Sequence, residues 1–465
     1  MNSKILTVIT LFKYKLWYKF PRNIFTQTEK KEFFFPTFIL AFIALSPALY
    51  VLPQSAEKIF WTIQVIQWTQ LLLLFFFSLK SVRAPLVTVI AISYILSRTI
   101  LIFSPPLFED DFYRYLWDGN VLSNGMNPYM HPPVSKQWEN LPSLWREKVN
   151  FPDIGTIYPP VAQYYFALIF LLFGESLFGL RLGSIVLELA GAALLYKLIK
   201  LEKISLKPLV IFLFFPTLMK ENVNSVHFDM LASNLFFFAF IVIKYKSQST
   251  AASLSAWGAF ALATCTKLFP LVFLPLMFRY TKRPIMGALF FLLVVLILYL
   301  PFLGAGTELF SGTITFTKHW RFFESIPYYV QIAVNFIEEI FRGPKSYTGE
   351  AATRIIIFVL MFATSIFISL KKSLVLENKV LSIFLFLYLF SMVLNSWYWI
   401  WSLPFLILYG FRILWVFPVI TTLGYSWFVS EDLYQKLHYP MYGLLLLTLT
   451  LYFLRSRVDG LARWR

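Results

Sequence analysis

The sequence predicts an all-α polytopic membrane protein with about 13–14 transmembrane helices. Apolar residues make up 58% of the 465 residues and charged residues only 14%, whereas soluble domains contain about 45–50% and about 25%. The apolar residues form long blocks, and the net charge of +17 is concentrated in short basic turns between them, as is typical of cytoplasmic loops. This composition excludes a disordered chain, a collagen-like chain and an ordinary soluble domain.

The basic residues also predict how the chain is oriented in the membrane. Residues 1–32 carry seven lysines and arginines, so we expect a basic, interfacial N-terminal segment on the cytoplasmic side. A single membrane domain is expected over 33–455, with 456–465 as a basic cytoplasmic tail. Within the membrane domain, 104–158 and 304–350 are expected to form large outer loops.

The apolar blocks predict the membrane helices individually. We expect them at 33–51, 59–79, 85–103, 159–173, 180–199, 230–243, 251–265, 268–278, 285–303, 351–370, 379–394, 397–411, 413–428 and 440–454. The segment 208–229 fits no simple span and is expected to be a broken or re-entrant element, which is tolerated only where it is buried in protein or lines a cavity. This order of helices places Lys200, Lys203 and Lys207 on the outer side, against the positive-inside rule.

The first outer loop, 104–158, carries the strongest local motif. It is the longest polar stretch in the chain, with seven acidic and four basic residues. The segment 109–119 begins with three successive acids, and its spacing predicts an amphipathic helix on the membrane surface with Asp111, Arg114 and Asp118 on one face. A solvated helix with an Asp–Arg pair is the alternative. We favour a functional site, because successive acids at a membrane edge are costly.

A second polar motif lies inside the broken element. His227 and Asp229 are predicted at membrane depth, where ionisable residues generally have a function. A polar cap between two helices, with His227 hydrogen-bonded to Asp229, explains the same pattern equally well. A His-x-Asp pair provides too few ligands for a metal site, and Cys265 is the single cysteine. We therefore assign no metal ligands and leave dependence on a divalent metal open.

Three further motifs combine cations or aromatic rings. Lys267 lies between two short apolar runs, where a snorkelling lysine is the simpler interpretation. His319 and Arg321 alternate with aromatic residues in the second outer loop, which suits a phosphate or a sugar face and equally an interfacial aromatic belt. Trp397 and Tyr398 begin an aromatic run at an outer boundary, where a belt is again the simpler interpretation and a platform that stacks on sugar rings is the alternative.

Together these motifs resemble the bacterial GT-C glycosyltransferases, and most closely their polyprenyl-phosphomannose-dependent mannosyltransferase-like branch. The resemblance covers about 100–405 and rests on the order of its elements, which are Asp-Asp-x-Tyr-Arg-Tyr-x-Trp-Asp-Gly at 110–119, Gly-Met-Asn-Pro-Tyr at 125–129, Tyr-Pro-Pro at 158–160 with Gln163, His227-x-Asp229, Thr266-Lys267-Leu268-x-Pro270, and Trp397-Tyr398 with Trp401 and Pro404. The chain departs from the family at one element, where the family often has Gly-His-Asn-Asp and this sequence has Val226-His227-Phe228-Asp229.

The resemblance implies a membrane enzyme that takes a sugar from a polyprenyl-phosphate carrier and generally inverts its anomeric configuration. The expected sugar is mannose or another hexose, and the expected acceptor is a lipid or cell-envelope glycan at the outer face of the bacterial cytoplasmic membrane. The catalytic acid carries over to Asp111, with Asp110 as the near alternative. The expected partners are the lipid-linked donor, the glycan acceptor and membrane lipids. Nothing in the sequence indicates nucleic-acid binding or a bound cofactor.

The chemistry of such a transfer assigns roles to the polar residues. The acceptor hydroxyl loses its proton to a general base, assigned to Asp111. Negative charge grows on the leaving phosphate, so cations aimed at it stabilise the transition state; the candidates are Arg114, Lys267, His319 and Arg321. The expected substrate-binding residues are Tyr115, Asp118, Asn127, Tyr129, Tyr158, His227, Asp229, Trp397 and Tyr398.

Other functions remain open from the sequence. A flippase or transporter of lipid-linked glycans is expected to show internal repeats and charges along a midplane path, whereas here the polar residues concentrate at the outer rim. A glycan ligase or polymerase works at the same face but transfers a whole glycan. A structural or sensor membrane protein is a further alternative. A variant with both Asp110 and Asp111 replaced that remains fully functional would support it.

Overall fold

The structure is a computed structural model that describes residues 27–52, 55–79, 86–246, 249–342, 349–438, 443 and 464. Over this part of the chain the protein consists of helices and their connections, and the one β-type pairing is an isolated bridge between Phe322 and Val393. The predicted all-α class is therefore confirmed. The predicted N-terminal segment 1–32, the last predicted span 440–454 and the tail 456–465 lie largely outside the described residues.

Six helical stretches in the described residues are long and apolar enough to cross a membrane. They are Phe34–Val51 (α2, Gln27–Leu45, with η1, Ser46–Val51), α3 (Ala56–Leu79), α4 (Leu86–Phe103), α7 (Leu177–Glu202), Pro284–His319 (α12, Pro284–Tyr299, η6, Leu300–Phe310, and α13, Ser311–His319) and α15 (Gly349–Leu370). The bent pair of η4 (Leu218–Asn224) and α9 (Asp229–Lys246) makes a seventh if it counts as one span. The protein is thus a polytopic membrane protein, as predicted.

The other predicted spans that lie in the described residues form helices that are shorter or broken, so fewer long helices are found there than the 13–14 predicted for the whole chain. These elements are α8 (Lys207–Leu213), α10 (Thr250–Thr264), η5 (Phe269–Phe273), α11 (Leu274–Tyr280), α16 (Leu376–Phe390), η7 (Ser396–Trp401), α17 (Leu403–Leu408), η8 (Arg412–Trp415), α18 (Val416–Ile420) and η9 (Thr421–Phe428). The segments 104–158 and 304–350, which were predicted to be outer loops, contribute α5 (Asp111–Ser123), η2 (Lys136–Trp138), η3 (Arg146–Lys148) and α14 (Ile326–Arg342), and α6 (Pro160–Phe173) follows the first of them.

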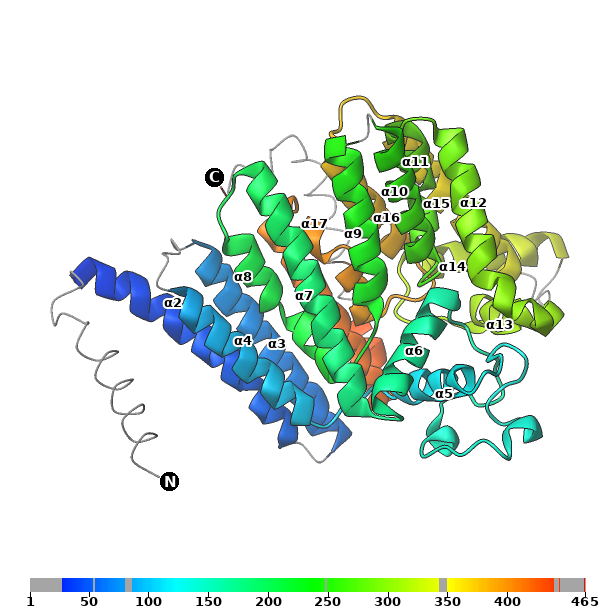
Figure 1. Ribbon diagram of the computed structural model, residues 1–465, viewed down its shortest axis with the longest axis horizontal. Helices are drawn as coiled ribbons and strands as arrows, with labels where there is room; N and C mark the ends of the chain where they lie inside the picture. The colour runs from blue at the N-terminus through cyan, green and yellow to red at the C-terminus, as the bar shows by residue number, and fades with distance from the viewer. Residues whose placement is uncertain are drawn as a thin grey trace, which may run out of the picture.

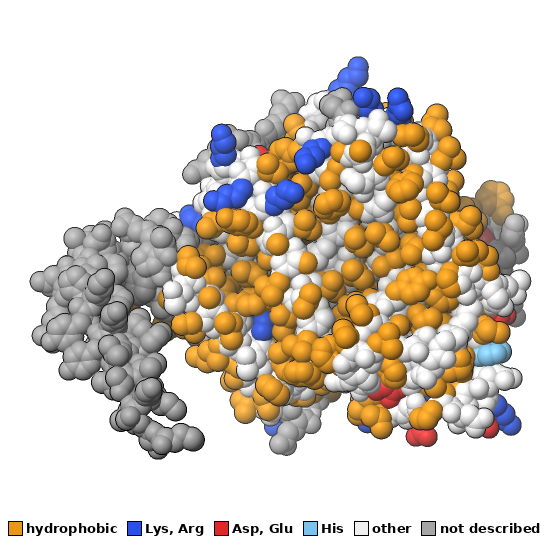
Figure 2. Space-filling model, in the orientation of Figure 1, with side chains coloured by type: hydrophobic (Ala, Val, Ile, Leu, Met, Phe, Trp, Pro, Cys, Tyr) orange, Lys and Arg blue, Asp and Glu red, His pale blue; other side chains and the backbone are white. Residues whose placement is uncertain are grey.

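The helices form one bundle with a basic end. Figure 1 shows the C-terminal ends of α7 and α9 at the end of the bundle opposite α5. Lys244 near the end of α9 forms ion pairs with Glu202 of α7 and Glu377 of α16, so these helix ends meet. Figure 2 shows that most of the visible lysines and arginines gather at this end, whereas most of the visible acidic side chains lie toward the other end. We call the helix ends that carry Lys200, Lys244 and Lys246 the basic end.

The predicted span 159–173 has both of its ends next to the segment 104–158. This segment forms α6, which is only 14 residues long, and both of its ends contact the first outer loop. The carbonyl of Tyr158, just before α6, accepts a hydrogen bond from Tyr129, and Glu175, just after α6, accepts one from Asn120. The helix α7 therefore begins next to the segment 104–158 and ends at the basic end.

Three lysines lie at the basic end, with Lys244 and Lys246. Lys200 lies in the last turn of α7 and Lys203 caps that helix, next to the Glu202–Lys244 pair of the basic end. Lys207 opens the following helix, α8, within reach of the charge of Arg412. The sequence placed these lysines on the opposite side of the membrane from Lys244 and Lys246, and this separation was wrong, because the short helix α6 was counted as a crossing.

The segment 208–229 is broken, as predicted. After α8 the chain forms the π-helix η4, turns at Val226 with a positive φ of 57°, and enters α9 at a bend of 117°. Every side chain of η4 is buried, including Lys220, Glu221 and Asn222. A π-helix is rare and often occurs at functional sites, and this one places charged groups inside the bundle.

Candidate active site

Residues of α5 and α13 line a cavity of about 600 Å³. Figure 1 shows α5 at the end of the bundle away from the basic end. The cavity brings together eight residues that the sequence suggested, from segments far apart in the chain. These are Asp110, Asp111, Arg114, Tyr158, Lys267, Arg321, Trp397 and Tyr398. Glu109, Asn150 and Tyr425 also line it. The cavity therefore combines carboxylates, cations and aromatic rings, which suits a charged sugar-containing ligand.

The start of α5 positions the acidic motif. Asp110 occupies the N-cap position and Asp111 the first turn, where the partial positive charge of a helix N-terminus stabilises acidic side chains. The amide nitrogen of Asn150 donates to Asp110 at 2.8 Å and to Asp111 at 2.9 Å. The hydroxyl of Tyr115, one turn further along, lies 3.4 Å from the other oxygen of Asp111. Asp111 is thus held at both carboxylate oxygens.

The environment of Asp111 suits a base. Burial in the cavity raises the pKa of the Asp111 carboxyl above its usual range, and the negative charge of Asp110 adds to this effect. The hydrogen bonds from Asn150 and Tyr115 and the positive charge of Lys267 act in the opposite direction. Asp110 is exposed and lacks the contact with Tyr115. Of the two predicted acids, Asp111 is therefore the one that the fold holds in a fixed position.

Arg114 and Asp118 form the predicted i,i+4 pair, at 2.9 Å. Arg114 lines the cavity, but Asp118 is buried behind it and accepts hydrogen bonds from Thr156 and Gln163. Arg114 also donates to the carbonyl of Ile154 in the loop. Asp118, which we expected to bind substrate, instead fixes the cation that faces the cavity.

Lys267 and Asp229 form an ion pair at 3.2 Å next to the aromatic rings of the cavity. Asp229 is fully buried, and its other oxygen accepts a hydrogen bond of 2.5 Å from Trp401. The ammonium of Lys267 lies over the ring of Phe228 at 4.6 Å. Lys267 lines the cavity rather than snorkelling to a membrane surface, and Asp229 holds it there. The alternative in which Asp229 hydrogen-bonds to His227 is not what the structure shows.

His227 lies beneath the cavity and does not line it. Its ring stacks on Trp397 with centroids 3.7 Å apart, and its Nδ1 lies 3.3 Å from the hydroxyl of Tyr115. His227 and Tyr115 were expected to bind substrate, but they contact each other and do not line the cavity. Trp397 and Tyr398 do line it.

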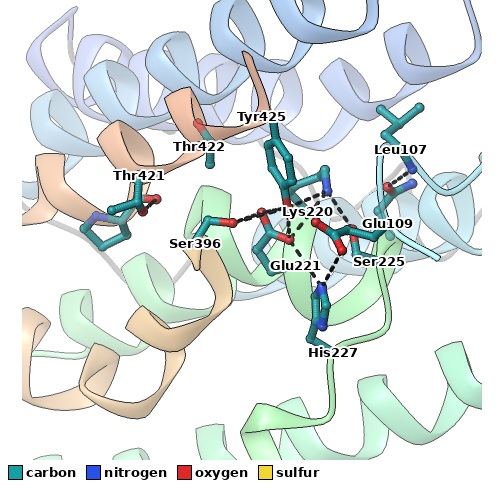
Figure 3. Close-up of polar contacts among 12 residues, drawn as sticks. Leu107, Glu109, Lys220, Glu221, Ser225, His227, Ser396, Thr421, Thr422 and Tyr425 are labelled. Carbon is teal, nitrogen blue, oxygen red and sulfur yellow. Dashed lines mark hydrogen bonds and ion pairs between the residues drawn. The ribbon is translucent and has the colours of Figure 1, made fainter. Parts of the chain in front are cut away.

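A buried polar cluster surrounds His227 (Figure 3). Glu221 accepts hydrogen bonds from Ser396 at 2.7 Å and from Tyr425 at 2.8 Å. Lys220 donates to Ser225 at 2.6 Å and lies over the ring of Tyr425. Because η4 and η9 bring these groups together from distant parts of the chain, the cluster connects the broken element to the floor of the cavity.

Glu109 links this cluster to the cavity. Its carboxylate lies 3.7 Å from Nε2 of His227 and only 8% of its side chain is exposed. Burial raises the pKa of Glu109 well above its usual range, although the positive charge of Lys220 favours the charged form. Glu109 is therefore a cavity-lining carboxyl suited to hold a proton.

Of the remaining predicted residues, one lines the cavity and three do not. Arg321 lines the cavity and is held by Glu324 at 2.7 Å, whereas His319 is exposed and lies outside the lining. Asn127 donates to the carbonyl of Phe302 at 3.0 Å and Tyr129 to that of Tyr158 at 2.7 Å. Asn127 and Tyr129 thus anchor the segment 104–158 and do not line the cavity.

Sequence reasoning gave no role to five residues of the site, and one of these, Glu109, is the first of the three successive acids at 109–111. Asn150 and Tyr425 lie in segments without any motif, and no local signal marks them. Lys220 and Glu221 lie in the broken element, but nothing in the sequence pairs them with Tyr425. In the described residues no group of three or more His, Cys, Asp or Glu side chains is arranged to hold a metal ion.

Comparison with known proteins gives one match. The model of the MptA_B family, described as the N-terminal domain of alpha-(1->6)-mannopyranosyltransferases, matches residues 49–282, about half of the chain. The matched region includes the acidic motif, the broken element and Lys267, and it ends before the aromatic run at 397–401. No curated protein and no solved structure matches significantly.

Proposed function

The chain belongs to the alpha-(1->6)-mannopyranosyltransferase family, and from this premise we propose that it transfers a mannosyl residue from a polyprenyl phosphate to a lipid or cell-envelope glycan. The observation that carries this proposal is the cavity in which Asp111 faces a set of cations. Lys267, Arg114 and Arg321 all line it together with Asp111. A carboxylate and several cations around one cavity are what deprotonation of a hydroxyl and departure of a phosphate require.

The transfer proceeds as one displacement at the anomeric carbon. Asp111 takes the proton from the acceptor hydroxyl while the acceptor oxygen forms a bond to that carbon. The bond from the carbon to the phosphate oxygen breaks, and the phosphate leaves with both electrons of that bond. Its charge grows from about −1 to near −2, since the second pKa of a phosphate monoester is about 6. Lys267 and Arg114 stabilise this growing charge more than the charge of the bound donor.

The outer face of the membrane is the proposed location of the reaction. The cavity lies away from the basic end, and basic helix ends mark the cytoplasmic side of membrane proteins. A polyprenyl-linked donor suits this location, because its sugar is presented in the membrane rather than in the cytoplasm. The bacterial cytoplasmic membrane is accordingly the proposed membrane.

The aromatic residues of the cavity support a sugar and lipid ligand. Trp320, Phe428 and Tyr398 line it alongside the charged groups, so apolar and polar surfaces face the same ligand. Sugar rings stack on aromatic side chains through their C–H groups. The phosphate end of the donor then lies near the cations and the glycan acceptor near Asp111.

The test is a transfer assay with purified protein in lipid. Radiolabelled polyprenyl-phosphate mannose is the donor, membrane glycolipids provide the acceptor, and GDP-mannose serves as the control donor. We expect transfer from the polyprenyl donor by the wild type and a loss of about 10²–10⁴-fold in Asp111→Asn.

Other outcomes would reassign the function. Transfer by Asp111→Asn at the wild-type rate would move the base to Asp110. No transfer from any of a panel of polyprenyl-phosphate sugars, together with movement of lipid-linked glycan across the bilayer, would support a flippase. Transfer of a whole glycan in place of one sugar would support a ligase.

A further inference from the structure

A second cavity lies between three helices at the basic end. It has a volume of about 390 Å³ and is lined by residues of α7, α9 and α10. The helix α9 packs against both α7 and α10 (Figure 1). This cavity, which we call the basic-end cavity, shares no lining residue with the candidate active site. Its contents therefore call for an explanation separate from sugar transfer.

The basic-end cavity combines an apolar groove with two cations. On α9, Phe238, Val242 and Lys246 line it at intervals of four residues, so they share one face of the helix. Lys246 ends α9 and Phe238 lies eight residues deeper, which is about 12 Å along the helix axis. On α7, Leu194 lies one turn deeper than Lys197. The apolar walls thus extend into the bundle from lysines near the basic end.

The two lysines of this cavity are available to a ligand. Lys197 and Lys246 are exposed, and neither forms an ion pair with another described residue. The neighbouring Lys244, in contrast, pairs with both Glu202 and Glu377. The acids of the basic end that lie nearest therefore already have a cation, and the positive charge of Lys197 and Lys246 is left for an anion from outside the chain.

We propose that the basic-end cavity binds an anionic glycerophospholipid, with its phosphate at Lys197 and Lys246 and part of an acyl chain along the apolar walls of α7 and α9. Basic pockets between membrane helices on the cytoplasmic side bind acidic lipid headgroups, and a basic end marks that side. The helix α7 is long and apolar enough to cross a membrane, so lipid reaches the cavity directly. The proposal does not depend on the proposed sugar transfer.

Charge and apolar walls together select this ligand. A soluble phosphate pairs with the lysines but leaves the groove beside Phe238 and Val242 unused. A zwitterionic lipid fills the groove but brings its own ammonium next to two lysines. The first turn of α10 also lines the cavity through Ala251, and the partial positive charge of that helix end adds to the attraction for an anion.

The test measures lipid binding by the purified full-length protein in detergent. Native mass spectrometry counts the lipids that stay bound after incubation with phosphatidylglycerol or with phosphatidylcholine of the same acyl chains. We expect one phosphatidylglycerol to be retained at concentrations at which phosphatidylcholine and glycerol phosphate are not. Equal retention of the two lipids, or retention of glycerol phosphate as strong as that of phosphatidylglycerol, would overturn the proposal.

Two double variants distinguish the cavity from the general charge of the basic end. A lysine near an anionic lipid contributes about 5-fold in affinity, so Lys197→Gln with Lys246→Gln should bind phosphatidylglycerol about 30-fold more weakly. Lys200→Gln with Lys282→Gln removes the same charge from two exposed lysines that do not line the cavity. Lys282 also lies at this end, because its backbone nitrogen donates to Ser253 in the first turn of α10. Equal losses in the two double variants would overturn the proposal.

Ala251→Trp tests the groove while keeping both lysines. Ala251 is exposed and lines the cavity, so a tryptophan there occupies space that the acyl chain needs. We expect affinity for phosphatidylglycerol to fall about 10-fold, as the loss of about two buried CH₂ groups would give. The lipid should also raise the midpoint of thermal unfolding less than in the wild type. Wild-type affinity in Ala251→Trp would overturn the proposed place of the acyl chain. Because no readout uses sugar transfer, failure here leaves the proposed function standing, and the reverse also holds.

Discussion

Asn150 donates a hydrogen bond to Asp111 across 2.9 Å, from a loop position 39 residues further along the chain. The same amide also holds Asp110 at 2.8 Å. One loop residue thus orients both acids at the start of α5. Because Asp111 is the proposed base, the folding of the outer loop and the geometry of the reaction depend on the same contact.

Asn150→Ala is therefore expected to slow the reaction without weakening substrate binding. A hydrogen bond to a charged group contributes about 1.5–3 kcal/mol, which corresponds to a loss in kcat of about 10-fold to 100-fold. KM should change little, since Asn150 contacts the base. The measurement is steady-state transfer, with Gln137→Ala, an exposed amide of the same loop, as control. A large rise in KM with an unchanged kcat would show that Asn150 binds substrate instead.

The pH dependence of transfer should follow the charge of Asp111. A general base must be ionised, so kcat/KM falls as the pH drops through the pKa of Asp111. Because burial raises this pKa above the usual range of an aspartate, the fall should occur at a higher pH than for an exposed carboxylate. The measurement is kcat/KM across the acid range in the free enzyme.

Two variants should shift this acid limb in opposite directions. Asp110→Asn removes a neighbouring negative charge that raises the pKa, so the limb moves to lower pH. Asn150→Ala removes a hydrogen bond that lowers the pKa, so the limb moves to higher pH. If the acid limb shifts in the same direction in both variants, or in neither, Asp111 is not the group whose titration produces it.

Local patterns predicted much of the site because its residues lie in compact motifs. The acids at the start of α5, the Arg114–Asp118 pair and the broken element before α9 follow from spacing and composition. The contacts of Asn150 and Tyr425 could not be predicted, since they join loops and helices whose pairing is determined by tertiary packing. The sequence placed the end of α7 away from the end of α9, whereas the Glu202–Lys244 ion pair joins them, because apolar length does not reveal that both ends of α6 lie next to the same loop.

Tertiary packing also explains why some residues lie elsewhere than the sequence predicted. Asp118 and Asp111 lie on one face of α5 by sequence spacing, yet they are two turns apart. Asp111 is at the cavity, and Asp118 lies where Thr156 and Gln163 surround it. Helical spacing gives the face of a helix but not what each turn of that face contacts.

Gly119 is expected to tolerate no side chain, because α5 and α6 approach each other closely there. A Cβ at this position would lie 2.5 Å from the carbonyl oxygen of Phe166, a backbone atom that cannot move aside. Overpacking of this kind costs about 1–3 kcal/mol. Gly119→Ala should therefore lower the midpoint of thermal unfolding in detergent, whereas Gly304→Ala, where the added Cβ meets nothing within 4 Å, should leave it unchanged. Equal midpoints for both variants would contradict the close packing of α5 on α6.

The Lys267–Asp229 pair should contribute separately to stability and to activity. Lys267→Met leaves the buried carboxylate of Asp229 without its cation, and breaking a buried ion pair in this way costs about 3–5 kcal/mol. The double variant Lys267→Met with Asp229→Asn removes both charges and keeps an oxygen that can accept from Trp401. We expect thermal unfolding of the double variant to return toward the wild-type midpoint while transfer stays low, because the cation that faces the phosphate is still missing. Recovery of transfer together with stability would show that Lys267 serves only to neutralise Asp229.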